Sequence, residues 1–333
     1  MLSIQVWKAF CQEGVSVATD ASAGRKRRNR FPNREAFAIM GTAEQPHRTA
    51  KGRIGMEFQK DREFLGKTAI FSGAASGMGL CFAKAWTELG GNAVMCDINE
   101  DVLRAKWEEI DREHPGKAAY VVTDVRDYAS VCHARDEAVR IFGGIDVLVN
   151  FAGGTAVRVR KVDRDRYPEF PDVPIEVYDW GLDVNLRGQL YFAHAVTKVM
   201  REERRGLIVN IGSITGMEGD GYGMDYPTAK AGAMFGLTKS LARFGAPYGI
   251  RAVCVSPGPV LTRPAMANMK TLLGRAAVPR EIIDLILFIA SDQGLRLSFP
   301  PRNKKMAWAS NSGSALAALP LPLEQWPPLL LTC

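Results

Sequence analysis

The chain has 333 residues, of which 47% are hydrophobic, so it can build a large α/β domain with a substantial core. No window of the sequence reaches the roughly 18 consecutive apolar residues of a membrane span, and no membrane partner is predicted. Most of the net charge of +7 lies in residues 1–55, which hold 10 Lys/Arg and 4 Asp/Glu. The remainder is nearly neutral, and this argues against nucleic acid as a partner of the core.

Cysteine and histidine usage indicates neither a metal site nor a disulfide framework. The four histidines do not stand at metal-ligand spacing, and the cysteines form no CxxC pair. Reduced thiols and a cytoplasmic location are therefore expected. The cysteines are Cys11, Cys81, Cys96, Cys132, Cys254 and Cys333.

Three segments differ in character along the chain. Residues 1–62 are basic, lack periodicity and are predicted to form a disordered extension, in which "RKRR" suggests an anion-binding adaptor as one alternative function. Residues 63–293 alternate between short apolar runs and amphipathic stretches. Residues 294–333 show neither period and are predicted to form an irregular tail.

The alternation in residues 63–293 predicts an α/β fold. Uninterrupted apolar strands separated by helices indicate a parallel sheet covered on both faces, a doubly wound Rossmann fold in a single domain. The strands are expected in "KTAIFS", "NAVMCD", "AAYVVTD", "IDVLVN", "GLIVNIG" and "RAVCVS". The helices are expected over 77–89, 99–113, 127–142, 178–204 and 226–244.

The first expected strand runs into "SGAASGMG", which contains Gly73, Gly77 and Gly79. Glycines permit a tight turn and close approach of the backbone to a pyrophosphate, which the next helix N-terminus attracts. A purely structural strand–helix turn is the alternative interpretation of these glycines.

Asp97 ends the second expected strand, where a carboxylate can accept hydrogen bonds from adenosine ribose hydroxyls. Its charge repels a 2′-phosphate, and Ser76 stands where a basic residue would attract one. Both features favour NAD over NADP, although a helix N-cap is the alternative role for Asp97. Asp124 and the "NFAGG" segment, residues 150–154, end the next two strands at the same edge of the sheet.

"SITGMEGDGYGMDYPTAK", residues 213–230, contains a candidate proton-transfer group. Tyr226 and Lys230 stand four residues apart and share a helix face, and Ser213 follows the fifth expected strand. A nearby ammonium favours the phenolate, so Tyr226 can exchange a proton with a substrate oxygen that Ser213 holds. The alternative is an ordinary surface helix with an exposed tyrosine and lysine.

Taken in order, these motifs resemble those of the short-chain dehydrogenase/reductase family, classical type. The resemblance covers about residues 63–293 and includes "DVNLRG" around Asn185 and "SPGPVLT" at 256–262. Ser72 stands where threonine is commoner, and Phe151 replaces the second asparagine of an Asn-Asn-Ala-Gly motif.

The resemblance implies hydride transfer between the nicotinamide of NAD and a secondary alcohol or ketone of hydroxysteroid, sugar-alcohol or 3-oxoacyl type. It implies that Tyr226 is the acid or base, that Lys230 lowers its pKa, that Ser213 orients the substrate and that Asn185 supports a relay water. It also implies a homodimer or homotetramer. The cofactor-binding residues would be Gly73, Ser76, Gly77, Met78, Gly79, Asp97, Asp124, Val125, Asn150, Ala152, Gly153, Tyr226, Lys230, Pro257, Gly258, Val260 and Thr262.

Three segments depart from the family pattern, one of which is a short substrate loop after Thr262 that suggests a more open site. The stretch from Asn150 to Asn185 is longer than expected and is predicted to form a loop at the mouth of the site. After "PREIIDLILFIASD" the family's last strand is replaced by "QGLRLSFPPRNKK". That replacement leaves a catalytically inactive dinucleotide-binding or scaffold protein as the alternative function and puts oligomer formation in question.

Overall fold

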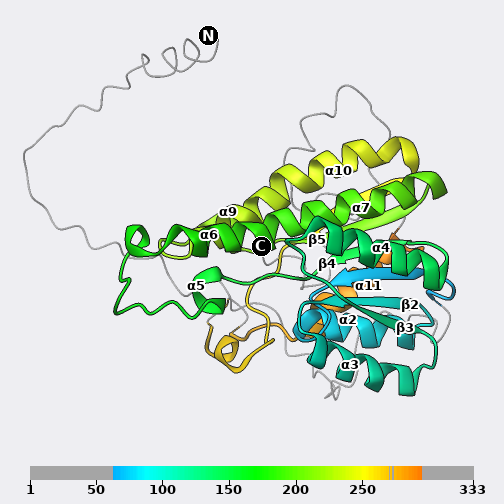
Figure 1. Cartoon of the computed structure of the whole chain (residues 1–333), viewed down its shortest axis with the longest axis horizontal. Coiled ribbons are helices and arrows are strands. Elements are labelled where there is room, and N and C mark those ends of the chain that lie inside the picture. The colour runs from blue at the N-terminus through cyan, green and yellow to red at the C-terminus, as the bar shows by residue number, and fades with distance from the viewer. Residues whose placement is uncertain (1–62, 270, 272–273, 295–333) are drawn as a thin grey trace, which may run out of the picture. The chain divides into compact units, whose positions relative to one another are not determined.

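The computed structural model describes residues 63–269, 271 and 274–294. A parallel sheet with the strand order β3-β2-β1-β4-β5-β6 forms the middle layer of this part (Figure 1). The strand order reverses between β1 and β4, so the crevice that binds ligands in such sheets opens there. The strands are β1 (Thr68–Ser72), β2 (Asn92–Asp97), β3 (Ala118–Val122), β4 (Val147–Asn150), β5 (Gly206–Ile211) and β6 (Ile250–Val255).

Helices cover both faces of the sheet, as Figure 1 shows. One face carries α2 (Gly77–Glu88), α3 (Glu100–Glu113) and α11 (Pro279–Ala290). The other carries α4 (Tyr128–Phe142), α7 (Gly188–Glu203) and α10 (Thr238–Gly245). The remaining helical elements are α5 (Ala156–Val159), η1 (Phe170–Asp172), α6 (Ile175–Leu182), η2 (Asp183–Arg187), α8 (Thr215–Glu218), α9 (Asp225–Ala231), η3 (Gly232–Leu237), η4 (Ala246–Tyr248) and η5 (Pro264–Asn268).

The two helical layers enclose separate hydrophobic cores because successive strand residues point to opposite faces. Ala69 and Phe71 of β1 join the core beneath α2 and α11, whereas Ile70 joins the core beneath α4 and α7. Both faces of the strands are therefore buried, which explains their unbroken apolar runs. The expected fold class and all six expected strands are confirmed.

The two longest expected helices are each interrupted by a short π-helical turn. Between α6 and α7, η2 widens the ladder, and the Gly188 N–H donates to the Asp183 carbonyl five residues earlier. Between α9 and α10, η3 does the same, from Thr238 to Ala233. Such turns often mark functional sites: η2 contains Asn185, and η3 follows α9, the helix that contains Tyr226.

Phe151, which departs from the family motif, is part of an aromatic cluster below the glycine turn. Its ring centroid lies 6.4 Å from that of Phe71 and 5.6 Å from that of Phe82. Phe82 also packs edge-on against Phe71 at 5.1 Å and stacks on Trp86 at 5.4 Å. The cluster thus joins β1, α2 and the loop after β4, and apolar packing accounts for phenylalanine at this position.

The long segment after β4 packs against the chain that leads to α9. Val157, Val173 and Tyr178 form a small apolar cluster of their own, against which Tyr222 packs. The Tyr222 hydroxyl donates to the Tyr167 carbonyl at 2.7 Å. This segment therefore lies close to Tyr226, as the loop at the site mouth was expected to do.

The sheet ends at β6 within the described residues. Arg251 of β6 donates from its guanidinium to the carbonyls of Ile289 and Gly294, at 2.9 and 3.2 Å, and so holds the end of α11. The proposed extension and nearly all of the proposed tail lie outside the described residues, so their limits stay predictions. No helix in the described part combines the length and apolarity needed to cross a bilayer.

Phe82→Ala is expected to lower the free energy of unfolding by about 3–5 kcal/mol, because the removed ring leaves a cavity in the aromatic cluster. Urea denaturation followed by tryptophan fluorescence measures this loss. Lys84→Ala, on the exposed face of the same helix, is the matched control and should change it by less than about 0.5 kcal/mol. A similar loss in both variants would contradict the packing role.

Candidate active site

In the glycine turn between β1 and α2, backbone atoms lie so close together that a side chain would not fit between them. Gly73 has a φ of +71°, and a Cβ on Gly79 would lie 2.1 Å from the Gly73 carbonyl oxygen. The turn is fixed to β2, since the Ala75 N–H donates to Asp97 Oδ2 at 3.0 Å. Ser76, exposed at the N-cap of α2, makes no side-chain capping bond. The first N–H groups of α2 are therefore available to an anion.

Asp97 lies at the end of β2 beside this turn. Besides the bond from Ala75 it accepts one from the Asn99 N–H at 3.1 Å. The N-cap of α3 is Asn99, which accepts from the Val102 N–H at 3.2 Å. Helix capping therefore does not account for Asp97, whereas contact with the glycine turn does.

The other expected adenosine-side residues gather at the same edge of the sheet. Asp124 forms an ion pair with Arg126 at 2.6 Å, and this hydrogen bond holds the pKa of Asp124 below its usual value. Val125 packs against Gly188. Asn150 donates to Asn210 at 2.9 Å, and its buried Oδ1 accepts no hydrogen bond from the described residues.

Asn185 ties the loop after β4 to the helical layer. Its amide oxygen accepts from the Gly154 N–H at 2.9 Å, and its amide nitrogen donates to the Gly154 and Gly181 carbonyls, at 3.0 and 2.8 Å. Ala152 is held from the other side, because its N–H donates to the Ser72 hydroxyl at 3.1 Å. The backbone at Gly153 is thus fixed by neighbours on both sides.

Lys230 is buried beside the same loop, with 2% of its surface exposed. Its ammonium donates to the Ile211 carbonyl at 2.8 Å. A Cβ on Gly153 would lie 3.3 Å from Nζ, so glycine there leaves room for the lysine. Burial lowers the pKa of Lys230 from 10.5 to about 8.

Ser213 and Tyr226 meet at the other end of this group. The Ser213 oxygen accepts hydrogen bonds from the hydroxyl and the N–H of Thr215, at 2.8 and 3.3 Å, which leaves its own O–H to donate. The Lys230 Nζ lies 5.4 Å from the centroid of the Tyr226 ring. The structure therefore brings Ser213, Tyr226 and Lys230 together, as the sequence predicted.

The electrostatics of Tyr226 differ from the expectation in one respect. Burial raises the pKa of Tyr226, while the nearby Ser213 hydroxyl and the charges of Arg158 and Arg263 act to lower it. Sequence reasoning missed both arginines, which lie far apart in the chain and have no motif to mark them.

The segment after β6 lies beside Ser213 and the glycine turn. The Ile214 N–H donates to the Pro257 carbonyl at 3.1 Å, and Val260 bridges to Ala277. Gly258 is exposed, with open space where a Cβ would lie. The Thr262 methyl group lies 3.3 Å from the position of a Cβ on Gly77, so this segment reaches the glycine turn.

The turn at Gly73 and Gly79, the backbone exposed at Gly258 and the unpartnered oxygen of Asn150 fit a dinucleotide. Among the described residues no three His, Cys, Asp or Glu side chains converge as a metal site would require. The arrangement suits proton exchange at a substrate oxygen beside a bound nucleotide.

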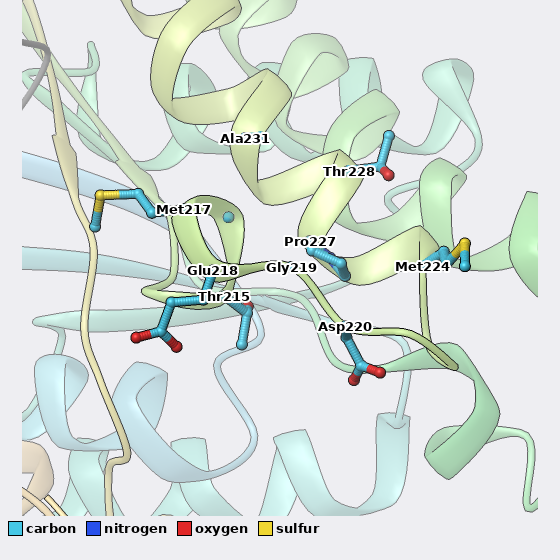
Figure 2. Close-up of a pocket in the computed structure, with 10 residues that line it drawn as sticks. Thr215, Met217, Glu218, Gly219, Asp220, Met224, Pro227, Thr228 and Ala231 are labelled. Atoms are coloured by element: carbon cyan, nitrogen blue, oxygen red, sulfur yellow. The ribbon is translucent and has the colours of Figure 1, made fainter. Parts of the chain in front are cut away.

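A shallow pocket of about 430 Å³ lies next to α9, as Figure 2 shows. Thr215 and Met217 of α8 line it from one side, and Pro227 and Thr228 of α9 from the other. Neither Tyr226 nor Ser213 lines it. It is therefore distinct from the crevice where the proposed chemical groups meet.

Fold and site define a dinucleotide-binding α/β oxidoreductase. The family model described as "short chain dehydrogenase" matches residues 67–272, and the chain belongs to this family. It is an oxidoreductase that acts on alcohol or carbonyl groups, with a nicotinamide cofactor.

Similar proteins have been named for several substrates. The chain is 37% identical over 235 residues, 69% of this chain and 84% of the relative, to 3-alpha-(or 20-beta)-hydroxysteroid dehydrogenase of Mycobacterium tuberculosis. It is 39% identical over 238 residues, covering 68% and 86%, to trans-4-hydroxycyclohexanecarboxylate dehydrogenase of Sinomonas cyclohexanicum. The crystal structure of NAD+-bound xylitol dehydrogenase superposes with a TM-score of 0.61 at 26% identity, covering 70% and 95%.

Buried Lys230 makes stability depend on pH. Below about pH 8 it is charged in the folded and the unfolded chain, and the cost of burying the charge is fully present. Between about pH 8 and 10.5 only the unfolded chain holds the proton, so the free energy of unfolding rises with pH. The rise relative to Lys230→Met should be about 3 kcal/mol at most.

Denaturant unfolding at several pH values measures this difference. In Lys230→Met the Ile211 carbonyl still accepts a hydrogen bond from the Gln189 side chain, at 3.2 Å. The substitution therefore leaves no buried acceptor without a donor. Lys198→Met, at an exposed position on α7, is the control and should show no pH-dependent difference from the unmodified chain. A parallel pH profile for Lys230→Met would show that Lys230 keeps its usual pKa.

Proposed function

We propose that the chain is an NAD-dependent alcohol dehydrogenase or ketone reductase in which Tyr226 is the proton-transfer group. The observation that carries this proposal is the convergence of Ser213, Tyr226 and Lys230 at the carboxyl ends of β4 and β5, beside the glycine turn. Such strand ends form the ligand crevice of doubly wound folds.

In this proposal the nicotinamide accepts or supplies the hydride, and the protein residues manage the proton. The Ser213 hydroxyl donates to the substrate oxygen and holds it near the phenol. During oxidation the ionised Tyr226 takes the hydroxyl proton as the carbinol carbon gives up its hydride. During reduction the phenol returns that proton to the carbonyl oxygen.

Three neighbours of Tyr226 partly offset the rise in its pKa that burial causes. Burial opposes ionisation of Tyr226, and Ser213, Arg158 and Arg263 favour it. Lys230 lies within a few ångströms of the ring and fixes α9 through the Ile211 carbonyl. For Asn185 we propose a positioning role through its bonds to Gly154. The relay water implied by the family resemblance stays a prediction.

The nucleotide would be held by the glycine turn and α2, with Asp97 at the adenosine ribose. The further proposed contacts are Ser76, Met78, Asp124, Val125, Asn150, Ala152, Gly153, Pro257, Gly258, Val260 and Thr262. The preference for NAD follows from the Asp97 carboxylate, which would repel a 2′-phosphate. Hydroxysteroid, sugar-alcohol and 3-oxoacyl substrates all fit this chemistry, and the named relatives include both a hydroxysteroid and a hydroxycyclohexanecarboxylate dehydrogenase.

Tyr226→Phe is expected to lower kcat/KM for secondary alcohols by roughly 10²–10⁴-fold, because the proton acceptor is lost. The dissociation constant of NADH, measured by nicotinamide fluorescence, should change little. Tyr248→Phe, in the short helix η4 before β6, is the matched control and should keep full activity. Retention of more than about a tenth of the activity by Tyr226→Phe would rule out its proposed role.

The unmodified chain is expected to bind NADH at least about tenfold more tightly than NADPH, and Asp97→Asn should reduce that preference. Asparagine keeps an oxygen that can accept from Ala75 and Asn99 while it removes the repelling charge. Asp101→Asn, at the exposed start of α3, is the control and should keep the preference. Equal affinity of the unmodified chain for both nucleotides would refute the role of Asp97.

A further inference from the structure

The charges of two arginines that are far apart in the sequence act on Tyr226. Arg158 belongs to α5, in the long segment after β4, and Arg263 immediately precedes η5, in the segment after β6. The charges of both act on the Tyr226 phenol, and the charge of Arg263 acts on Arg158. The two guanidiniums and the phenol therefore form one electrostatic group.

Arg158 is held at the crevice by contacts between its helix and the chain before Tyr226. The Ala156 N–H donates to the buried Asp225 carboxylate at 3.2 Å. A Cβ on Gly223 would lie 2.8 Å from the Thr155 methyl group, so α5 begins directly against this chain. Asp225 immediately precedes Tyr226, and the position of α5 is thereby fixed relative to the phenol.

The guanidinium of Arg158 lies beside the same loop as the Lys230 ammonium. Arg158 Nη2 is 2.9 Å from the position of a Cβ on Gly154, and Lys230 Nζ is 3.3 Å from the position of a Cβ on Gly153. Gly154 thus leaves space for the Arg158 guanidinium, and Gly153 leaves space for the Lys230 ammonium. Lys230 is buried, whereas Arg158 is exposed.

Arg263 enters the group from the cofactor side of the crevice. It follows Thr262, whose methyl group lies 3.3 Å from the position of a Cβ on Gly77 in the glycine turn. Its side chain is half-buried. The charge of Arg263 thus acts on the phenol from a segment that reaches the glycine turn.

Neither arginine has a carboxylate partner among the described residues. Other arginines of this part form close pairs, such as Arg126 with Asp124 at 2.6 Å and Arg275 with Glu281 at 2.7 Å. For Arg158, burial and the like charge of Arg263 lower the pKa, and only the Tyr226 phenol raises it. Two like charges held together without a counter-ion are an unfavourable arrangement, which a bound anion relieves.

We propose that Arg158 and Arg263 bind a substrate carboxylate, and that the site therefore acts on secondary hydroxy acids and the corresponding keto acids. The planar guanidinium matches a carboxylate in a bidentate pair, which arginine forms better than lysine. The alcohol carbon would stand a few bonds from the carboxylate, with its oxygen at Ser213 and Tyr226. This inference rests on the proposed role of Tyr226.

Turnover by the full-length chain with NAD tests the substrate class. Short aliphatic and cyclohexane secondary hydroxy acids are compared with their primary amides, which keep the shape and lack the charge. Acids should be preferred in kcat/KM by roughly tenfold or more, and Arg158→Gln or Arg263→Gln should reduce that ratio toward one. Arg158→Lys should restore part of it. Arg160→Gln, at the exposed end of α5, is the control and should keep the ratio.

Binding without turnover separates this inference from the proposed function. Cyclohexanecarboxylate should stabilise the NADH-loaded chain against thermal unfolding at a concentration roughly ten times lower than cyclohexanecarboxamide, and either glutamine variant should remove the difference. Equal stabilisation by the acid and the amide would overturn the carboxylate site even if Tyr226 proves essential. Preferential binding of the acid with no turnover of any alcohol would instead contradict the proposed function alone.

Arg263 also has a competing role, because it lies near the glycine turn. If Arg263→Gln weakens NADH binding as strongly as it weakens cyclohexanecarboxylate binding, the arginine serves the cofactor and the paired site is refuted. An unchanged NADH dissociation constant together with a lost preference for the acid supports the carboxylate site.

Discussion

Burial of the Lys230 ammonium is the constraint on which the geometry of the crevice depends. A charge removed from water must be hydrogen-bonded, and here the bond goes to the carbonyl of Ile211 at the end of β5. Gly153 leaves room at this point, because a Cβ there would lie 2.7 Å from Asn185 Oδ1 and 3.3 Å from Lys230 Nζ. The bond sets how α9 faces the sheet, and Tyr226, one turn earlier on the same helix face, takes its position from it.

Asn185 supplies the matching constraint from the helical layer. Its amide both donates to and accepts from Gly154 in the loop after β4, and it also donates to the Gly181 carbonyl of α6, just before the helix widens. A side chain inserted into a helical ladder is a known cause of such irregularity. The π-helical turn and the fixed loop therefore have one origin, and Phe151 secures the loop from below through the aromatic cluster.

The strands and the meeting of Ser213, Tyr226 and Lys230 were predictable because they depend on local signals. Fully buried parallel strands have continuous apolar sequences, and strand ends collect at one edge. The π-helical turns were not predictable, because the Asn185 amide chooses its partners only in the folded chain. Arg158 and Arg263 were not predicted for a similar reason. The position of Arg158 near Tyr226 depends on how α5 packs against Asp225 in the folded chain. The pKa of Tyr226 likewise depends on burial and on these distant charges.

The crevice combines residues proposed for proton transfer with residues proposed for substrate selection, and the two sets come from different parts of the fold. The groups proposed for proton transfer come from the sheet and from α9, within the packed layers, whereas the arginines come from two connecting segments outside them. Residues in such connections can be exchanged without disturbing a core that tolerates few changes of volume. Selectivity can therefore diverge during evolution while the chemistry is preserved, and an engineer can graft new connections onto an unaltered catalytic frame.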